Sequence, residues 1–276
     1  MVDRPDGAPG RAAPTSDEKG LRIDDAAVAR WPGPHLARTG APPGRAVPGG
    51  RLMLGLDLAR PRGSAYQVLV VGAHADDIEI GCGGTILHLV EQGLPLRVTW
   101  VVLSAGDARE REAHDSAAAF LKDVERANVV VKGFRDGFFP WDGAEIKEFF
   151  ETLKPVAPDL VLVHRRDDAH QDHRLVAELA WNTFRDHLVL EYEIPKYDGD
   201  LGNPNLFVPL PAGTCERKVD LLLEGFPSQR ARGWFTPDTF WALLRLRGIE
   251  SGSPSGFAEG FHCRKAVVLP TKGGAA

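Results

Sequence analysis

The stretch that decides the fold is Val68-Leu-Val-Val-Gly-Ala-His74-Ala-Asp76-Asp77, an apolar run that ends in a polar cluster. A run of β-branched and small apolar residues is typical of a strand that is buried on both faces of a sheet. The residues after it emerge at the carboxyl edge of that sheet, where open α/β sheets bind ligands. Two adjacent carboxylates beside an imidazole need water or a cation to offset their repulsion. We interpret this cluster as half of a metal site.

A second apolar run, Leu160-Val-Leu-Val-His164, also ends in a polar cluster, which contains His170, Asp172 and His173. Parallel strands deliver the residues that follow them to the same edge of a sheet, so we expect the two clusters to meet. His74 and Asp77 are three residues apart, as are His170 and His173, and this spacing lets each pair share a face. Two histidines and one carboxylate make a three-ligand set with an open fourth position, which is typical of catalytic zinc.

Strand-like and helix-like blocks alternate along most of the chain. We expect strands at 66–73, 96–103, 128–131, 159–164, 188–194 and 260–269, and helices at 83–92, 109–123, 145–153, 172–187, 215–224 and 238–246. Strands separated by helices predict right-handed βαβ units. The fold class is therefore a three-layer α/β fold with a mainly parallel sheet and a site at the carboxyl ends of its strands.

The chain divides into an arm and one domain. Residues 1–60 are rich in Pro, Gly, Ala and Arg, and bury too little to offset their ordering entropy, so we expect a partly mobile arm. Residues 61–276 are expected to form a single α/β domain. Within it, 195–213 is rich in Pro, Gly, Asn and Asp, which favours a long lid or binding loop over the alternative of a disordered insert.

Composition narrows the function classes. A formal net charge of -5 supplies no basic field for nucleic acid or an anionic membrane surface. The sequence has no apolar run long enough for a membrane span and no secretion-signal order, so we expect a cytoplasmic protein. The 3 cysteines are scattered without C-x-x-C spacing, which argues against a disulfide framework and a cysteine-bound structural zinc.

The two polar clusters carry a family resemblance. Ala73-His-Ala-Asp-Asp77 with Gly83-Gly-Thr85, followed by His170-Gln-Asp-His173, resembles the two signature motifs of the PIG-L/LmbE-like family of zinc-dependent N-acetylglucosaminyl deacetylases. The resemblance covers residues 67–187 and implies a Rossmann-like fold.

The resemblance also implies roles for individual side chains. His74, Asp77 and His173 are the implied metal ligands, and Asp76 is the implied general base. His170 is expected to face the developing oxyanion, and Asp172 to support His170. The implied cofactor is Zn²⁺, although the same ligand set also suits Fe²⁺ or Co²⁺.

Substrate contacts are expected from three further residues. Arg111 resembles a family arginine near the substrate, but the glutamate usual three residues later is His114 here. Asp136 with Gly137 resembles an Asp-Gly pair that contacts sugar hydroxyls. His164 closes its strand beside the second cluster, where a substrate contact competes with a buried supporting role.

These observations lead to an expected function. The chain is expected to be a metal-dependent hydrolase that removes the acetyl group from an N-acetylglucosamine unit of a soluble glycoside, with a glycosylated natural product as one candidate. The alternatives are a non-catalytic metal- and sugar-binding protein on the same fold, or a metal amidase for another amide. The expected partner is the small-molecule glycoside, with neither nucleic acid nor membrane insertion, and a homo-oligomer is compatible with the sequence.

Overall fold

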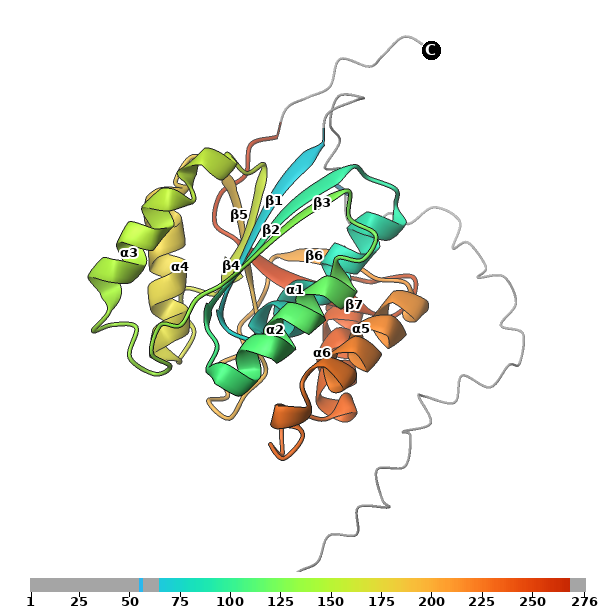
Figure 1. The fold of residues 1–276 in the computed structure, drawn as a ribbon. Coiled ribbons are helices and arrows are strands. Elements are labelled where there is room, and N and C mark those ends of the chain that lie inside the picture. The colour runs from blue at the N-terminus through green and yellow to red at the C-terminus, as the bar shows by residue number, and fades with distance from the viewer. Residues whose placement is uncertain (1–54, 57–64, 269–276) are drawn as a thin grey trace, which may run out of the picture. The chain divides into compact units, whose positions relative to one another are not determined.

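The computed structural model describes residues 55–56 and 65–268, apart from the side chains of 107 and 108. Most of the proposed arm, 1–60, therefore lies outside the described residues. The described chain is built on a 7-stranded sheet in the order β3-β2-β1-β4-β5-β7-β6, with helices on both faces (Figure 1). No helix among the described residues is both long and apolar enough to cross a membrane.

Five neighbouring strands of the sheet pair in parallel, and the last two pairings in the sheet are antiparallel. The parallel strands are β1 (Tyr66–His74), β2 (Leu96–Ser104), β3 (Arg126–Val131), β4 (Leu160–His164) and β5 (Leu188–Tyr192). The edge consists of β6 (Leu206–Pro209) and β7 (Ala258–Cys263), with β7 antiparallel to both β5 and β6. In the centre, β1 pairs directly with β4, so the two predicted polar clusters follow neighbouring strands.

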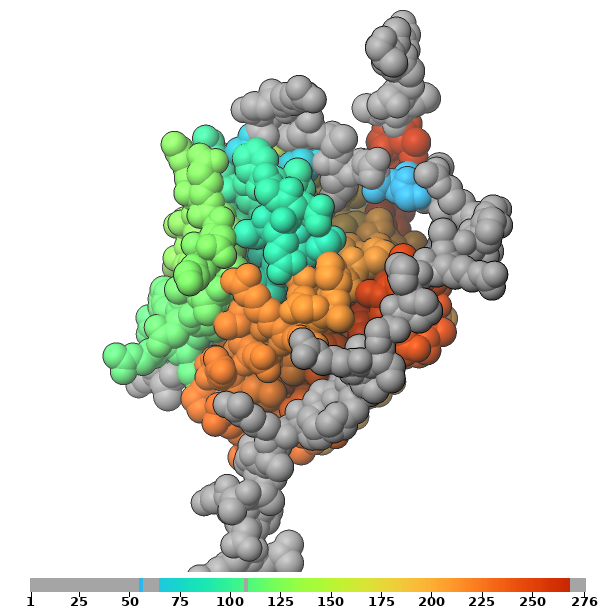
Figure 2. Space-filling view, turned by 90° about the vertical axis from the view of Figure 1, so that its right-hand side faces the viewer, coloured from blue at the N-terminus to red at the C-terminus, as the bar shows by residue number. Residues whose placement is uncertain are grey.

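Two helical layers cover the sheet. One contains α1 (Asp77–Glu91), α2 (Asp107–Phe120), α5 (Ala212–Gly225) and α6 (Pro237–Glu250), and the other contains α3 (Gly143–Thr152) and α4 (Gln171–Thr183) (Figure 1). In Figure 2, which shows the first layer, the orange segment of α5 and α6 lies beside teal and green segments from residues before 130. Successive side chains of β1 enter opposite cores: Val68 and Val70 pack toward the first layer, and Leu69 and Val71 toward the second.

The predicted three-layer α/β fold with a mainly parallel sheet is confirmed. Several boundaries differ: the first helix begins at Asp77 rather than at residue 83, α4 ends at Thr183 rather than at 187, and the last strand ends at Cys263 rather than at 269. Glycines in a helix interior cost about 1 kcal/mol each relative to alanine, which argued for the later start. Tertiary packing reverses this preference, because a Cβ at Gly81 would lie 2.2 Å from the Tyr192 ring and one at Gly83 2.6 Å from Phe120.

The loop expected at 195–213 is shorter than predicted. It contains strand β6, and α5 already begins at Ala212. The strand was missed because it is only 4 residues long and ends in Pro209. Proline cannot donate to a sheet ladder, so it is tolerated here only because β6 is the edge strand.

Candidate metal centre

The ends of β1 and β4 bring the two polar clusters together. His74 is the last residue of β1, Asp76 caps α1 and Asp77 begins it. After β4, His170 caps α4, whose first turn contains Asp172 and His173. Because β1 and β4 are neighbours in the sheet, both helices start at the same edge, as the sequence predicted.

Three buried donor atoms converge at this edge. His74 Nδ1 lies 3.2 Å from His173 Nε2 and 3.3 Å from Asp77 Oδ2, and His173 Nε2 lies 3.5 Å from Asp77 Oδ1. Tetrahedral zinc bonds of about 2.0–2.2 Å place neighbouring ligand atoms about 3.3–3.6 Å apart. The predicted ligand set therefore has the spacing that a single tetrahedral cation requires.

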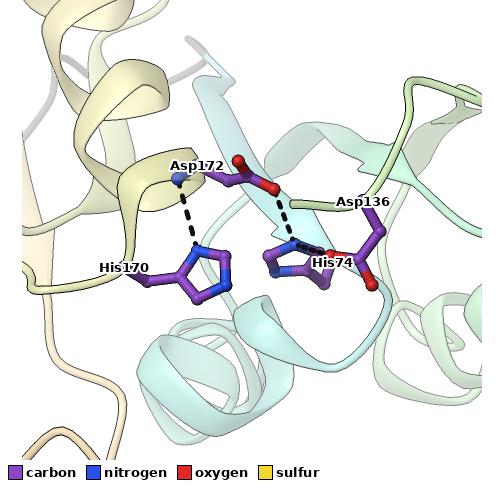
Figure 3. A group of neighbouring side chains, drawn as sticks. All are labelled: His74, Asp136, His170 and Asp172. Carbon is purple, nitrogen blue, oxygen red and sulfur yellow. Dashed lines mark hydrogen bonds and ion pairs between the residues drawn. The ribbon is translucent and has the colours of Figure 1, made fainter. Parts of the chain in front are cut away.

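In each imidazole, the nitrogen that faces away from Asp77 lies beside a carboxylate. His74 Nε2 lies 3.0 Å from Asp136 Oδ1 and 3.3 Å from Asp172 Oδ2 (Figure 3). His173 Nδ1 lies 3.1 Å from Asp168 Oδ2. A carboxylate that accepts from one ring nitrogen directs the lone pair of the other toward a metal. Both rings thus aim their remaining nitrogens at Asp77.

Other groupings of donors are less suitable. Among the described residues, the sets His74–Asp136–His170–Asp172 and His164–Asp168–His173 also bring potential ligand atoms together. Both sets use the outward nitrogens, His74 Nε2 and His173 Nδ1, which the carboxylates already engage. The set of His74, Asp77 and His173 is the one that uses the inward nitrogens of both rings.

The electrostatics of the ligands agree with this grouping. Burial alone would raise the pKa of Asp77, but His173, His164 and His74 hold it well below its ordinary value. Burial, with His164, lowers the pKa of His173 to about 4. The pKa of His74 is raised well above its ordinary value because Asp77, Asp136 and Asp172 outweigh burial, which lowers it. Metal binding would therefore displace a proton from His74.

Asp76 lies beside the ligands but points to another partner. Its Oδ1 accepts a hydrogen bond of 2.8 Å from Arg109 on α2. Burial raises the pKa of Asp76, the Arg109 guanidinium opposes this change, and the adjacent Asp77 adds to it. A carboxylate whose pKa is raised toward neutrality is suited to accept and return a proton.

The arginine that reaches the site is not the one expected. Arg111 lies on the exposed side of α2, whereas Arg109, two residues earlier, pairs with Asp76. The family pattern has a glutamate three residues after its arginine. Counted from Arg111, that position is His114, but counted from Arg109 it is Glu112, which fits the pattern. The spacing of an arginine and a glutamate could have revealed this assignment.

His164 is not placed to contact a substrate. It is fully buried, its Nε2 accepts a hydrogen bond of 2.9 Å from the Ala73 N–H, and the same atom lies 3.1 Å from Asp77 Oδ2. Its ring stacks on His173 with the centroids 3.8 Å apart. These contacts favour the alternative, a buried supporting residue, over the expected substrate contact of His164.

Asp172 and His170 meet through the backbone. The N–H of Asp172 donates to His170 Nδ1 at 3.3 Å, while the Asp172 carboxylate accepts from the N–H groups of Gly137 and Phe139 at 2.7 and 3.1 Å (Figure 3). The carboxylate faces His74, so the expected support of His170 by this group is not observed. His170 is half-buried, and burial followed by His74 lowers its pKa. An accepting Nδ1 leaves the ring proton on Nε2, which remains a donor.

A family model matches the segment that holds both clusters. Residues 69–184 match the model described as PIG-L: GlcNAc-PI de-N-acetylase. Residues 69–184 form a PIG-L family domain. The match confirms the expected family resemblance for residues 69–184, and together with the deacetylases that the chain resembles it indicates an N-deacetylase. The PIG-L domain is also similar in sequence to the uncharacterized deacetylase YaiS of Escherichia coli, with 25% identity over 138 residues, covering 46% of this chain and 74% of YaiS.

Solved structures share the fold of the PIG-L domain. The N,N'-diacetylchitobiose deacetylase of Pyrococcus horikoshii is 21% identical with a TM-score of 0.56, covering 75% of this chain and 86% of that one. GalB, the 4-carboxy-2-hydroxymuconate hydratase of Pseudomonas putida, is 20% identical with a TM-score of 0.57, covering 74% and 98%. Teicoplanin deacetylase Orf2, solved in a zinc-inhibited form, is 14% identical with a TM-score of 0.55, covering 71% and 97%. A hydratase among them means that the fold alone does not define the reaction.

Proposed function

We propose that the protein is a metal-dependent N-deacetylase that hydrolyses the acetamide of an N-acetylglucosamine unit in a glycoside. The observation that carries the proposal is the convergence of His74 Nδ1, Asp77 and His173 Nε2, at 3.2 to 3.5 Å from one another, beside a carboxylate that is not needed as a ligand. A metal held by His74, Asp77 and His173 would lower the pKa of bound water to about 7 and would polarise a carbonyl oxygen.

Two residues beside the proposed ligands have separate roles in amide hydrolysis: one transfers protons and the other stabilises the oxyanion. Asp76 takes a proton from the attacking water as the new C–O bond forms, and returns it to the amine nitrogen as the C–N bond breaks. His170 donates from Nε2 toward the developing oxyanion, a contribution worth about 3–4 kcal/mol for donors of this kind. The products are acetate and the free amino sugar. Asp172 contributes by holding His74 against the loop of Gly137 and Phe139.

The substrate proposal extends beyond the acetamide. Asp136, whose side chain is 63% exposed, is proposed to contact sugar hydroxyls. Phe138 and Trp141 follow it on the same loop and are 37% and 74% exposed, which would supply an apolar surface for an aglycone. Deacetylation of teicoplanin by a protein of this fold supports a glycosylated natural product as the substrate class. We keep Zn²⁺ as the proposed metal, Fe²⁺ as its alternative and the cytoplasm as the proposed location.

Acetate release tests the proposal directly. The full chain is stripped of metal, loaded in turn with Zn²⁺, Fe²⁺ or Co²⁺, and assayed against a panel of N-acetylglucosaminides with small, lipid and glycopeptide aglycones. The proposal expects acetate from at least one glycoside, only with metal. Several metals are needed because zinc inhibits one protein of the same fold. Metal binding without acetate from any glycoside would favour a sugar-binding protein or an amidase for another amide.

A further inference from the structure

A lysine outside both sequence motifs reaches the metal centre. Lys196 lies beyond the end of β5, in the segment between β5 and β6, and its side chain is only 9% exposed. Its Nζ donates to Asp168 Oδ2 at 3.0 Å and to both carboxylate oxygens of Asp200 at 2.8 Å. Two buried or half-buried carboxylates therefore converge on one ammonium group.

Asp168 connects this lysine to a proposed metal ligand. The oxygen that accepts from Lys196, Oδ2, is also the oxygen 3.1 Å from His173 Nδ1. The other oxygen, Oδ1, accepts from the His170 N–H at 2.8 Å. Asp168 is 3% exposed, so water has little access to replace a lost partner. The contacts run without a gap from Lys196 through Asp168 to the ring of His173.

We propose that Lys196 is a positioning residue of the metal site, which acts by holding Asp168 in the place that orients His173. The inference rests on the proposed function for the presence of a metal. Asp168 and Asp77 contact different nitrogens of the His173 ring, and a buried carboxylate without a cation is costly. Lys196 offsets that cost on the side away from the metal.

Loss of Lys196 has a specific consequence for His173. Without the ammonium group, the buried Asp168 carboxylate has no cation to hold Oδ2 in place, and the His173 ring loses the acceptor that keeps its proton on Nδ1. The ring can then rotate, or carry its proton on Nε2, and neither form offers a lone pair beside Asp77. Loss of an outer partner of a ligating histidine typically weakens metal affinity about 10–100-fold.

The segment around Lys196 is itself attached to the start of α4. Asp200 Oδ2 accepts from the Ala169 N–H at 2.6 Å, and the Asp200 carbonyl accepts from Arg165 Nη1, also at 2.6 Å. Asp200 thus holds Lys196 from one side and the loop of the second motif from the other. This arrangement explains how a segment with no ligand of its own bears on metal affinity.

Zinc affinity of the full chain tests the inference. The dissociation constant for Zn²⁺ is measured by competition with a chromophoric chelator for wild type, Lys196→Met, Lys196→Arg, Asp168→Asn and the Lys196→Met/Asp168→Asn double variant. Lys196→Met should weaken binding about 10–100-fold, and Lys196→Arg should recover most of the loss. The double variant should be no weaker than Asp168→Asn, because the lysine acts through that carboxylate. Lys122→Met, at an exposed lysine that follows the C-terminal end of α2, is the control.

Four results would overturn the inference. A Lys196→Met variant with wild-type zinc affinity, or losses that add in the double variant, would show that Lys196 does not act through Asp168. If Lys196→Met does not fold, the comparison of Lys196→Arg with Asp168→Asn decides, and equal losses in both would count against the inference. Wild type that binds zinc but releases no acetate contradicts only the deacetylase, whereas wild type that binds no divalent metal contradicts both proposals.

Discussion

The ion pair between Lys218 and Glu259 supports the middle of α1, and its removal should be costly. Both side chains are 4% exposed and their charged atoms are 2.6 Å apart. Glu259 also accepts from the N–H groups of Gly84 and Thr85 at 2.8 and 2.7 Å, and Lys218 donates to the Ile80 carbonyl at 2.7 Å. The pair therefore binds the glycine-rich part of the helix that carries Asp76 and Asp77.

The size of the effect follows from the partners that remain. Lys218→Met leaves a buried carboxylate with two backbone donors but no cation, and Glu259→Gln leaves a buried ammonium group with neutral acceptors. Removing one partner of a buried pair costs about 3–5 kcal/mol, so each single variant should lose about that much stability. The double variant should lose less than the sum, because neither charge is left unpaired and the glutamine oxygen still accepts from the helix.

Urea unfolding of the metal-free chain measures these free energies without a contribution from metal binding. Arg217→Met is the matched control: Arg217 is the neighbouring residue and pairs at 3.7 Å with an exposed Asp123, an arrangement worth about 1 kcal/mol or less. If Lys218→Met costs no more than Arg217→Met, or if the two losses simply add, the pair does not support α1 as described.

Three other outcomes follow from the packing and titration of buried groups. Gly81→Ala, whose Cβ would lie 2.2 Å from the buried Tyr192 ring, should lose about 1–3 kcal/mol in urea unfolding, whereas Gly213→Ala, with open space at its Cβ, should lose nothing; equal effects would refute this. Burial raises the pKa of Cys215 to about 12, so a thiol reagent at neutral pH should leave it unmodified until the chain unfolds, and rapid native labelling would contradict its burial. Burial raises the pKa of Glu79 in the folded chain well above its ordinary value. The protonated carboxyl group therefore contributes its full stability below the pKa of the unfolded state, and this contribution is lost as the pH rises through the pKa of the folded state. Glu79→Gln should therefore become increasingly more stable than wild type at higher pH, and a constant difference would count against it.

Much of the fold and the core of the site could be predicted from local sequence. Val68–Val71 and Leu160–Val163 are apolar runs, which are typical of strands buried on both faces of a sheet. Parallel strands end at the same edge of a sheet, so the polar residues that follow the two runs were expected to meet there. In the structure, ligand atoms of His74, Asp77 and His173 lie within 3.5 Å of one another at this edge.

Residues whose role depends on side-chain reach could not be predicted in this way. Arg109 and Arg111 lie on one helix, and the rotation of α2 pairs Arg109 with Asp76; in the sequence, the spacing of Arg109 and Glu112 was the one signal that pointed to Arg109. His164 is separated from a substrate by burial, which depends on Tyr192 and Ala73 packing around it. Lys196 sits in a segment without periodicity, so no local pattern relates it to Asp168.

The central claim, that Asp77 holds the metal and its neighbour Asp76 moves the proton, is tested most directly by measuring bound metal and acetate release together. The experiment compares Asp76→Asn with Asp77→Asn, using the metal and glycoside that give turnover in the wild type. Asp76→Asn should keep one metal per chain and lose about 10²–10⁴-fold in turnover, and Asp77→Asn should lose both metal and turnover. Asp76→Asn with wild-type turnover, or Asp77→Asn with a full complement of metal, would contradict the assignment.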